Sequence, residues 1–309
     1  MAKFIAVANM KGGVGKTTTV VSLAETLAAY SIELERKAGG APKSILVVDL
    51  DAQASASFAL AGDTKHSAII RDGRTIDAFL DRFLIKQQQI SLASTVSKHI
   101  SDVSHMGKPL NIALIASSPH LRTLERGLIH VLTRGGYSLD RVESEIFAIL
   151  RAQLDKIATE YDYILFDCPP GISVMTEVAI RISDLTIVPT IPDFLSILGL
   201  DAFSQNVWSQ LAGGTAGLPV PRHLPHVLIT KRKKLAVQDA KVKELRDRGA
   251  SRQAGYRVLQ IEMPESQRVS DALERIESFP NYAQKWDATL RTKLADLVDE
   301  MNKIVVGRS

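Results

Sequence analysis

Short, uninterrupted apolar runs recur along this chain and alternate with segments in which apolar residues fall three or four positions apart. The runs lie at residues 4–8, 44–49, 110–115, 163–167, 184–190, 227–230 and 258–261. Such runs are typical of strands buried on both faces, whereas the wider spacing is typical of helices. Strands that alternate with helices predict an α/β fold, a single doubly wound, mostly parallel sheet flanked by helices.

Two regions are less regular. Residues 62–108 hold one amphipathic helix, from Ile76 to Leu84, whose apolar stripe we interpret as core rather than a partner site, and then a polar stretch. Near the C-terminus, residues 282–306 carry apolar side chains on one face and mixed charges on the other. We therefore expect one domain over residues 1–309, with a partly surface segment at about 62–108 and a packed helix at about 282–306. The first helix is expected to end near Tyr30.

Composition narrows the class of protein. No apolar run reaches the roughly 20 residues of a membrane-spanning helix, and the first strand begins too early for a signal peptide. The single cysteine, Cys168, excludes a disulfide within the chain and favours a cytosolic protein. The net charge is +4, but residues 222–257 alone hold eleven Lys or Arg and three Asp or Glu, a net charge of +8. This asymmetry favours a surface that faces a polyanion, although solvated helix faces would give the same count.

A glycine-rich loop joins the first predicted strand to the first predicted helix. Its residues are Lys11, Gly12, Gly13, Val14, Gly15, Lys16, Thr17 and Thr18. Glycines let the backbone approach phosphate oxygens closely, and the N–H groups at a helix start favour an anion. In such a loop Lys16 meets the β- and γ-phosphates of a nucleotide, and the Thr17 hydroxyl ligates Mg²⁺. The sequence therefore predicts that ATP and Mg²⁺ bind here.

Acidic residues stand at the ends of two other predicted strands. Asp49 and Asp51 follow the run at 44–49, and Asp167 ends the run at 163–167. The carboxyl ends of parallel strands are where open α/β sheets bind ligands. Four apolar residues followed by Asp167 form a Walker B pattern, which would hold Mg²⁺ through a water opposite Thr17. Asp49 and Asp51 fit either this edge of a site or a simple turn or helix cap.

The loop departs from the usual pattern, because Met10 stands where glycine is expected and Lys11 adds a second lysine. This loop resembles the deviant phosphate loop of the ParA/MinD family of dimeric ATPases. The resemblance implies that Lys11 reaches across a dimer interface to the nucleotide of the partner. The alternative is a loop lysine that remains in solvent.

Two further elements resemble the same family. In the D-x-D-x-Q element the second aspartate, here Asp51, orients the attacking water, although Ala52 and Ala54 replace the family's Pro and Gly. Residues 263–272 resemble the family's I-P-R-N-V-R-L-S-E-A element. Backbone near Pro264 would frame the adenine together with Glu265, which stands where the family has an arginine. Arg268 matches an arginine of the family's DNA-binding surface.

The resemblance implies a Mg²⁺-dependent ATPase that forms an ATP sandwich dimer, binds DNA non-specifically and positions a cargo such as a plasmid, a chromosome or a protein complex. The catalytic residues would be Lys11, Lys16 and Asp51. The DNA-binding residues would be Lys231, Arg232, Lys233, Lys234 and Arg268. We further expect a ParB-like or cargo adaptor that stimulates hydrolysis, no membrane partner, and a cytoplasmic, nucleoid-associated protein.

Several related functions are weighed against this one. A nitrogenase-iron-protein-like member needs two cysteines per subunit for its cluster, and this chain has one. A MinD-like membrane cycler needs a basic amphipathic tail, and residues 303–309 are short for that; a MinD-like positioning ATPase remains an alternative. A metabolic ligase of the dethiobiotin-synthetase type also remains open. It would need a second small-molecule pocket and would not respond to DNA.

Overall fold

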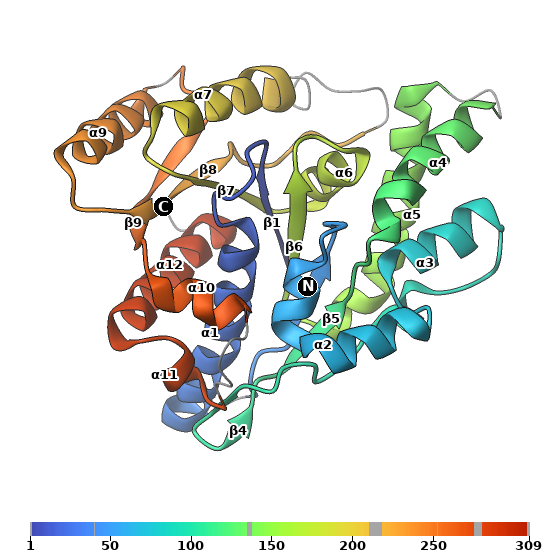
Figure 1. Cartoon of the computed structure of the whole chain (residues 1–309), viewed down its shortest axis with the longest axis horizontal. Helices are drawn as coiled ribbons and strands as arrows, with labels where there is room; N and C mark the ends of the chain where they lie inside the picture. Colours follow the sequence, from blue (N-terminus) through green and yellow to red (C-terminus); the bar gives the residue numbers. More distant parts are fainter. Residues whose placement is uncertain are drawn as a thin grey trace.

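The computed structural model describes residues 2–39, 41–134, 138–209, 218–251, 253–274 and 280–307. A seven-stranded sheet in the order β5-β2-β6-β1-β7-β8-β9 forms its centre, and every neighbouring pair of strands is parallel (Figure 1). The strands are β1 (Lys3–Asn9), β2 (Ile45–Asp49), β5 (Ile112–Ile115), β6 (Tyr163–Pro170), β7 (Leu185–Thr190), β8 (His226–Arg232) and β9 (Arg257–Pro264). The predicted fold class, a doubly wound parallel sheet flanked by helices, is confirmed.

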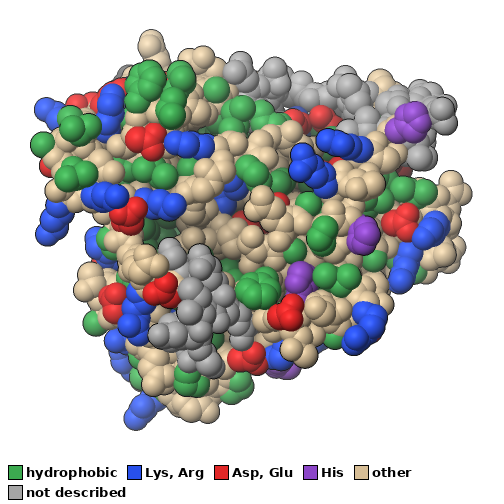
Figure 2. Space-filling model, in the orientation of Figure 1, with side chains coloured by type: hydrophobic (Ala, Val, Ile, Leu, Met, Phe, Trp, Pro, Cys, Tyr) green, Lys and Arg blue, Asp and Glu red, His purple; other side chains and the backbone are tan. Residues whose placement is uncertain are grey.

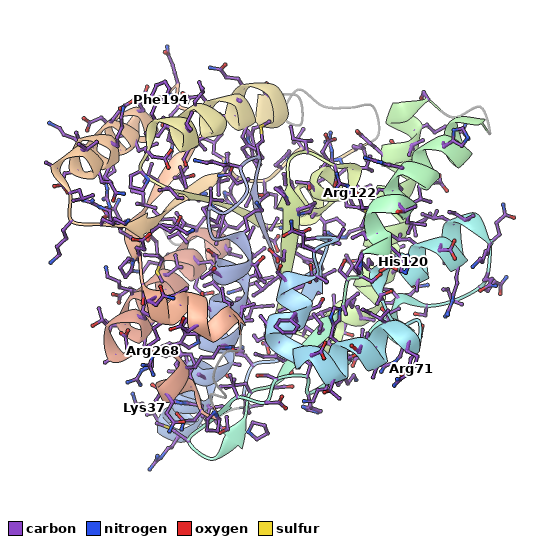
Figure 3. The ribbon with its side chains drawn as sticks, viewed as in Figure 1. Lys37, Arg71, His120, Arg122, Phe194 and Arg268 are labelled. Atoms are coloured by element: carbon purple, nitrogen blue, oxygen red, sulfur yellow. The ribbon has the colours of Figure 1, made fainter. Side chains whose placement is uncertain are left out.

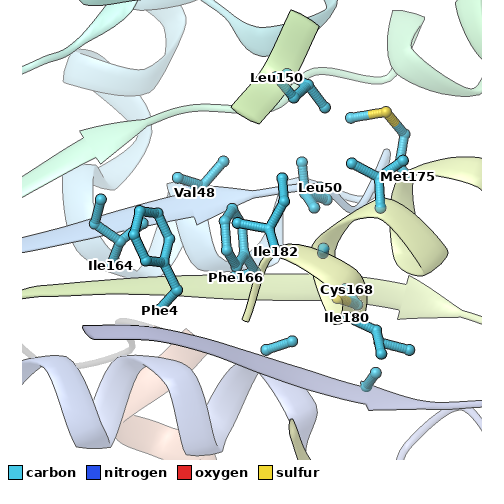
Figure 4. Close-up of a cluster of buried hydrophobic side chains, with 14 of the residues drawn as sticks. Phe4, Val48, Leu50, Leu150, Ile164, Phe166, Cys168, Met175, Ile180 and Ile182 are labelled. Atoms are coloured by element: carbon cyan, nitrogen blue, oxygen red, sulfur yellow. The ribbon is translucent and has the colours of Figure 1, made fainter. Parts of the chain in front are cut away.

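One face of the sheet packs against the helices of the middle of the chain. These are α3 (Ile76–Leu80) with η1 (Asp81–Ile85), α4 (His120–Arg134), α5 (Leu139–Ile157) with η3 (Ala158–Glu160), α6 (Val174–Ile182), α7 (Phe194–Ala202) with η4 (Phe203–Trp208), and α9 (Ala236–Ala250). Their apolar side chains meet alternate strand residues such as Phe4, Val48 and Phe166 (Figure 4). Cys168 is fully buried in this cluster, and burial raises the pKa of its thiol, which fits a structural role.

The opposite face packs against the first two helices and the C-terminal ones. These are α1 (Lys16–Ala38), α2 (Ser55–Arg71), α10 (Gln267–Glu274), α11 (Tyr282–Lys285) and α12 (Ala288–Val306). They cover the other set of alternate strand residues, among them Ile5, Val7 and Val47. Because both faces of the sheet are covered, the strands read as continuous apolar runs in the sequence rather than as alternating patterns.

The first helix is longer than expected. The prediction that it ends near Tyr30 is wrong, because α1 continues to Ala38. Ile32 remains buried beyond Tyr30, so the helix keeps packing through another turn. The helix ends at Gly39, whose φ of 75° is a conformation that glycine adopts without steric cost.

The single helix expected over residues 282–306 is instead two helices, α11 and α12. They are separated at Trp286 and Asp287, and the Asp287 side chain caps α12 by accepting the N–H of Leu290 at 2.9 Å. At the break, Lys285 Nζ and Trp286 Nε1 each donate to the buried carboxylate of Glu25 at 2.7 Å. The turn between the helices therefore fixes the C-terminal segment to α1.

Residues 62–108 contain more packed structure than expected. α2 extends through residue 71, and the predicted amphipathic helix is found as α3 and η1. Beyond it lie η2 (Leu92–Thr95) and a small antiparallel pair, β3 (Ser104–His105) and β4 (Lys108–Pro109). Leu92 and Ile100 are buried, so the polar stretch is anchored to the core at these points. Among the helices described here, none is both long and apolar enough to cross a membrane.

Candidate active site

A cavity of about 960 Å³ opens at the carboxyl ends of the strands, where open α/β sheets bind ligands. Its walls come from the glycine loop, the segment after β2, and the ends of β8 and β9. The predicted site residues among its lining are Gly12, Gly13, Gly15, Lys16, Thr17, Thr18, Asp51, Lys231, Pro264 and Glu265. The cavity thus brings together residues from both ends of the chain.

The glycine loop has the shape of an anion cradle. Gly13 and Gly15 have φ of 72° and 95°, and α1 begins directly after Gly15. The side chain of Lys16 curls back so that its Nζ donates to the Lys11 carbonyl at 3.0 Å. Burial lowers the pKa of Lys16, while Asp167 and Asp51 oppose that shift. A buried ammonium beside the backbone N–H groups of a helix start can hold a phosphate chain.

Two side chains that the sequence analysis did not select, Asn9 and Thr230, hold the loop to the sheet through three hydrogen bonds. The Asn9 side-chain amide donates to the Pro189 carbonyl at 2.7 Å and accepts the Lys11 N–H at 3.0 Å. The Thr230 hydroxyl donates to the Val14 carbonyl at 2.8 Å. Asn9 could have been found as the buried polar residue that ends the first apolar run. Thr230 could not, since its link to the loop spans most of the chain.

The side chain of Lys11 does not line the cavity in this structure. Its Nζ lies 3.3 Å from the Asp193 carboxylate and donates to the Ser196 hydroxyl at 2.9 Å. Asp193 caps α7 by accepting the Ser196 N–H at 2.7 Å. Burial opposes the shift, but the Ser196 hydrogen bonds and the Lys11 charge lower the pKa of Asp193. Lys11 therefore has partners within its own subunit and does not simply extend into solvent.

Thr17 and Asp167 meet beneath the loop. The Thr17 hydroxyl donates to Asp167 Oδ2 at 2.7 Å, while Oδ1 of the same carboxylate is buried without a hydrogen-bond partner. Burial and the neighbouring Asp49 raise the pKa of Asp167 well above its usual range. A hydroxyl oxygen and carboxylate oxygens are the hard ligands that Mg²⁺ prefers, so this pair fits a magnesium site. The unsatisfied Oδ1 is the kind of buried polar atom that an ion or its water would satisfy.

Asp49 and Asp51 are placed differently from each other. Asp49 is fully buried and accepts hydrogen bonds from the N–H and hydroxyl of Ser57 and from the Asp51 N–H. Burial raises the pKa of Asp49 to about 6. Asp51 borders the cavity, although its Oδ1 also accepts the Gln53 N–H at 2.9 Å. Asp49 therefore fastens the first turn of α2, whereas Asp51 combines a turn contact with access to the cavity.

The loop between β2 and α2 keeps a backbone conformation typical of glycine, although Ala54 stands where the family has glycine. Its φ of 52° and ψ of 32° place it in the left-handed region at the start of α2. A side chain at such a position costs about 1–2 kcal/mol relative to a right-handed conformation. The backbone therefore adopts a conformation that glycine favours, at a position where this chain has alanine.

Glu125, on α4, is an acidic residue on which the Asp51 charge acts and which no sequence pattern marks. One of its oxygens is buried without a partner. Burial raises the pKa of Glu125, the Ser173 hydroxyl lowers it, and the Asp51 charge raises it further. Ser173 caps α6, directly after the loop that follows β6. Glu125 thus joins α4 to the side of the site that holds Asp51 and that loop.

The cavity wall from β9 matches the predicted base-binding element in position. Pro264 ends β9 and borders the cavity, and Glu265 follows it. The Glu265 N–H donates to the Arg232 carbonyl at 3.1 Å, and its carboxylate lies 2.8 Å from Lys233 Nζ. The wall also includes apolar side chains such as Met263. A flat aromatic base can pack against such a surface.

The expected DNA-binding residues do not form one free patch. Lys231 borders the nucleotide-sized cavity, with a left-handed φ of 50°, and Lys234 is exposed. Arg232 is tied by ion pairs to Asp239 and, at 3.1 Å, to Glu262. The pairing of Lys233 with Glu265 is given above.

Arg268 is separate from that group. It lies on α10, on the opposite face of the sheet from α9, and donates to the Gln284 carbonyl (Figure 3). Within residues 222–257, the pairing of Arg232 with Glu262 and of Lys233 with Glu265 neutralises part of the net charge of +8. The exposed pair of Lys233 with Glu265 contributes only about 0–1 kcal/mol, so this lysine can still turn to a phosphate.

Comparison with known proteins places these features in a family. Residues 2–211 match the family model described as an AAA domain. The chain is 28% identical over 213 residues to the sporulation initiation inhibitor protein Soj of Bacillus subtilis, covering 67% of this chain and 65% of that protein. It is 27% identical over 207 residues to the chromosome partitioning protein ParA of Myxococcus xanthus, covering 67% of this chain and 58% of that protein. The matches thus span less than two thirds of these relatives.

Solved structures share the fold at low sequence identity. The structure of pNOB8 ParA bound to nonspecific DNA is 19% identical, with a TM-score of 0.69 and full coverage of both chains. A putative plasmid partition protein of Borrelia burgdorferi bound to AMPPNP is 18% identical, with a TM-score of 0.65 and coverage of 98% and 99%. Cobyrinic acid a,c-diamide synthase of Mycobacterium smegmatis, with bound ADP and magnesium, is 22% identical, with a TM-score of 0.60 and coverage of 89% and 92%.

Proposed function

Because this chain belongs to the ParA/MinD-type family, as its AAA domain over residues 2–211 shows, we propose that it is a Mg²⁺-dependent ATPase of the ParA type. ATP would occupy the cavity above β1. The observation that carries the proposal is the convergence on one cavity of Lys16, Thr17 and Asp51, with the buried Asp167 hydrogen-bonded to Thr17 behind the cavity wall. A phosphate cradle, a magnesium ligand set and a water-orienting carboxylate are the parts that nucleotide hydrolysis needs.

Each residue has a role in this proposal. The loop N–H groups and Lys16 would bind the phosphates, and Thr17 with Asp167 would hold Mg²⁺, directly or through water. The ion would neutralise charge that develops on the phosphate oxygens. Asp51 would orient the attacking water from the cavity wall, and the backbone at Pro264 and Glu265 would frame the adenine. Relatives of the same fold are solved with AMPPNP and with ADP and magnesium, which supports this assignment.

Lys11 would serve a second copy of the chain. In an ATP sandwich dimer it would leave Asp193 and reach the partner's nucleotide, where a trans-acting cation is worth about 10³–10⁵ in rate in comparable enzymes. Next to the Lys11–Asp193 pair, α7 exposes Phe194, Leu195 and Leu198, with 67%, 64% and 55% of their surface accessible. An exposed apolar group beside a partly exposed lysine supports burial of this region against another subunit.

The ATP-bound dimer would bind DNA without sequence preference and position a cargo on it. The candidate contacts are Lys231, Arg232, Lys233, Lys234 and Arg268, and the structure of pNOB8 ParA bound to nonspecific DNA supports this use of the fold. Hydrolysis, stimulated by a ParB-like or cargo adaptor, would release the dimer. Such a protein would work in the cytoplasm, at the nucleoid.

One titration tests this function. Turnover and light scattering are followed with ATP or ADP, with and without unrelated duplexes. The proposal predicts dimers and DNA binding with ATP alone, and an affinity that falls steeply with salt. Equal dimerisation and equal DNA binding with ADP and with ATP would contradict the proposal. No DNA response at low salt would favour a metabolic ligase, an alternative that the likeness to cobyrinic acid a,c-diamide synthase keeps in view at the level of the fold.

A further inference from the structure

A second basic surface lies far from the residues considered so far. Arg122 and Arg126 stand four positions apart on α4, and both are exposed. On the buried side of the same helix, Leu121 and Leu128 pack into the core. Within the ranges described, neither guanidinium has an ion-pair partner. We call Arg122 and Arg126 the α4 stripe; Figure 3 labels Arg122 at the start of the helix.

The α4 stripe contrasts with the basic segment around β8 and α9. In that segment Arg232, Arg246 and Arg248 are held by carboxylates, whereas exposed Lys234 and Lys243 have no ion-pair partner in the described structure. Paired cations must exchange one anion for another, while unpaired ones need only release counterions. The cations most available to a polyanion are therefore Lys234 and Lys243 near one edge of the sheet and the α4 stripe near the other.

These two groups of cations lie on the same face of the molecule. α4 and α9 belong to the helical layer that covers one face of the sheet. α4 follows the edge strand β5, and α9 packs on the opposite edge strand β9. Six strand intervals separate these edges, which corresponds to about 29 Å at about 4.8 Å per interval. Figure 2 shows Lys and Arg side chains over both regions.

This separation suits a DNA duplex. One helical turn of B-form DNA is about 34–36 Å, so the backbone returns to the same side of the duplex at nearly the span between the two edge strands, β5 and β9. Residues four apart on a helix are separated by about 6 Å, and arginine forks bind phosphate oxygens with two hydrogen bonds. An acidic protein segment could meet one group of cations, but the regular repeat over such a span favours a nucleic-acid backbone.

We infer that the α4 stripe is a second DNA-phosphate contact, so that one subunit spans about one turn of duplex between α4 and α9. This inference rests on the proposed function, since it assumes that the protein binds DNA. It adds a surface that lies outside the basic segment and outside the α10 element. It also places a DNA contact on the helix that carries Glu125 toward Asp51, and so close to the hydrolytic site.

The test uses the full chain with ATP and compares two double variants. Arg122→Gln/Arg126→Gln removes the α4 stripe, and Lys37→Gln/Arg71→Gln removes two exposed cations from α1 and α2, on the other face (Figure 3). Affinity for an unrelated duplex of about 20 base pairs is measured from about 50 to 200 mM salt. The slope of log K against log salt is negative, and each lost phosphate contact makes it less steep by about 0.9. For the α4 variant the slope should become less steep by about 1.8 per subunit, and the control variant should keep the wild-type slope.

Duplex length gives an independent readout. Wild type should bind about 20 base pairs more tightly than about 8, because only the longer duplex reaches both groups at about 3.4 Å per base pair. The α4 variant should lose most of this difference while keeping its ATP affinity and DNA-free turnover. If the α4 variant keeps the wild-type salt slope and the wild-type dependence on duplex length, the inference is overturned. This holds even if the variant fails to bind an acidic partner protein, because the α4 stripe would then serve that protein and not DNA. Absence of any wild-type DNA binding with ATP at low salt would instead refute the proposed function itself.

Discussion

The ammonium group of Lys11 lies 3.3 Å from the carboxylate of Asp193, so the loop lysine is held on the first turn of α7 and away from the cavity. Both side chains are about a third exposed or more, at 33% and 40%. A pair of this kind contributes at most about 1 kcal/mol, because water and salt screen it. The contact can therefore keep Lys11 ordered in one subunit and still yield to a nucleotide of another subunit.

Asp193→Asn should make this release easier. Asparagine keeps a helix cap but removes the charge that attracts Lys11. Half-maximal dimerisation should then need up to about fivefold less ATP, the equivalent of about 1 kcal/mol. Light scattering during an ATP titration measures the shift. Asp193→Ala serves as the comparison, since it also loses the cap and about 1 kcal/mol of stability. A higher ATP requirement for Asp193→Asn would show that the pair helps dimerisation rather than opposing it.

Asp51→Ala and Lys16→Ala should separate chemistry from binding. Asp51 borders the cavity with its carboxylate fixed by the Gln53 N–H, and in the proposed site it orients water rather than holding phosphate, so its loss should slow turnover at least about 10²-fold and leave ATP affinity nearly unchanged. Lys16→Ala removes the buried ammonium and should abolish ATP binding. Equilibrium binding of a fluorescent ATP analogue, measured beside turnover, distinguishes the two. Loss of ATP affinity in Asp51→Ala would mark Asp51 as a metal or structural residue.

Ala54→Gly should stabilise the protein. Glycine relieves the left-handed strain at φ 52° but adds chain entropy, which leaves a net gain of up to about 1 kcal/mol. Ala52→Gly is the matched control two residues earlier, where φ is not positive. It should destabilise by about 0.5–1 kcal/mol. Urea unfolding measures both free energies, and a less stable Ala54→Gly would show that the loop strain is absent in solution.

Glu177 should make stability depend on pH. Burial and the Glu143 carboxylate raise the pKa of Glu177 from 4.5 to about 7, and Arg181 opposes the shift. A carboxyl group with a raised folded pKa contributes stability below its unfolded pKa of 4.5, and loses it as the pH rises through about 7. Wild type should thus lose Tm between pH 5 and pH 8, and Glu177→Gln should lose less. Exposed Glu145→Gln, on α5 beside Glu143, should follow wild type; equal pH profiles for all three proteins would rule out this role for Glu177.

The sequence predicts the sheet and the phosphate loop because their signals are local. Seven contiguous apolar runs mark strands that are buried on both faces, and the loop's chemistry lies within eight successive residues. The partners that decide how the loop residues are held are remote in the chain. Lys11 meets Asp193 across 182 positions, and Glu125 approaches Asp51 only because α4 packs beside the site. No local pattern marks such contacts.

The same limit explains the basic region. A charge count over residues 222–257 cannot see Glu262, Glu265 or Asp201, which lie outside the segment and neutralise its cations in the folded chain. The break at Asp287 was also missed, although Asp before a helix is a common cap. A continuous apolar stripe hid it, because α11 and α12 pack on the same core.

The central claim, that Lys11 completes the nucleotide site of a partner subunit, is tested most directly by mixing two inactive variants. Lys11→Ala should bind ATP but lack a partner lysine, and Asp51→Ala should dimerise but lack its own water-orienting carboxylate. In a mixed dimer the Lys11→Ala subunit keeps Asp51 and receives Lys11 from its partner, so one complete site forms. An equal mixture should regain about one quarter of the wild-type ATPase rate. With random pairing about half of the dimers are mixed, and each mixed dimer holds one active site where the wild-type dimer holds two. A mixture as inactive as its components, or full hydrolysis by Lys11→Ala alone, would contradict the account.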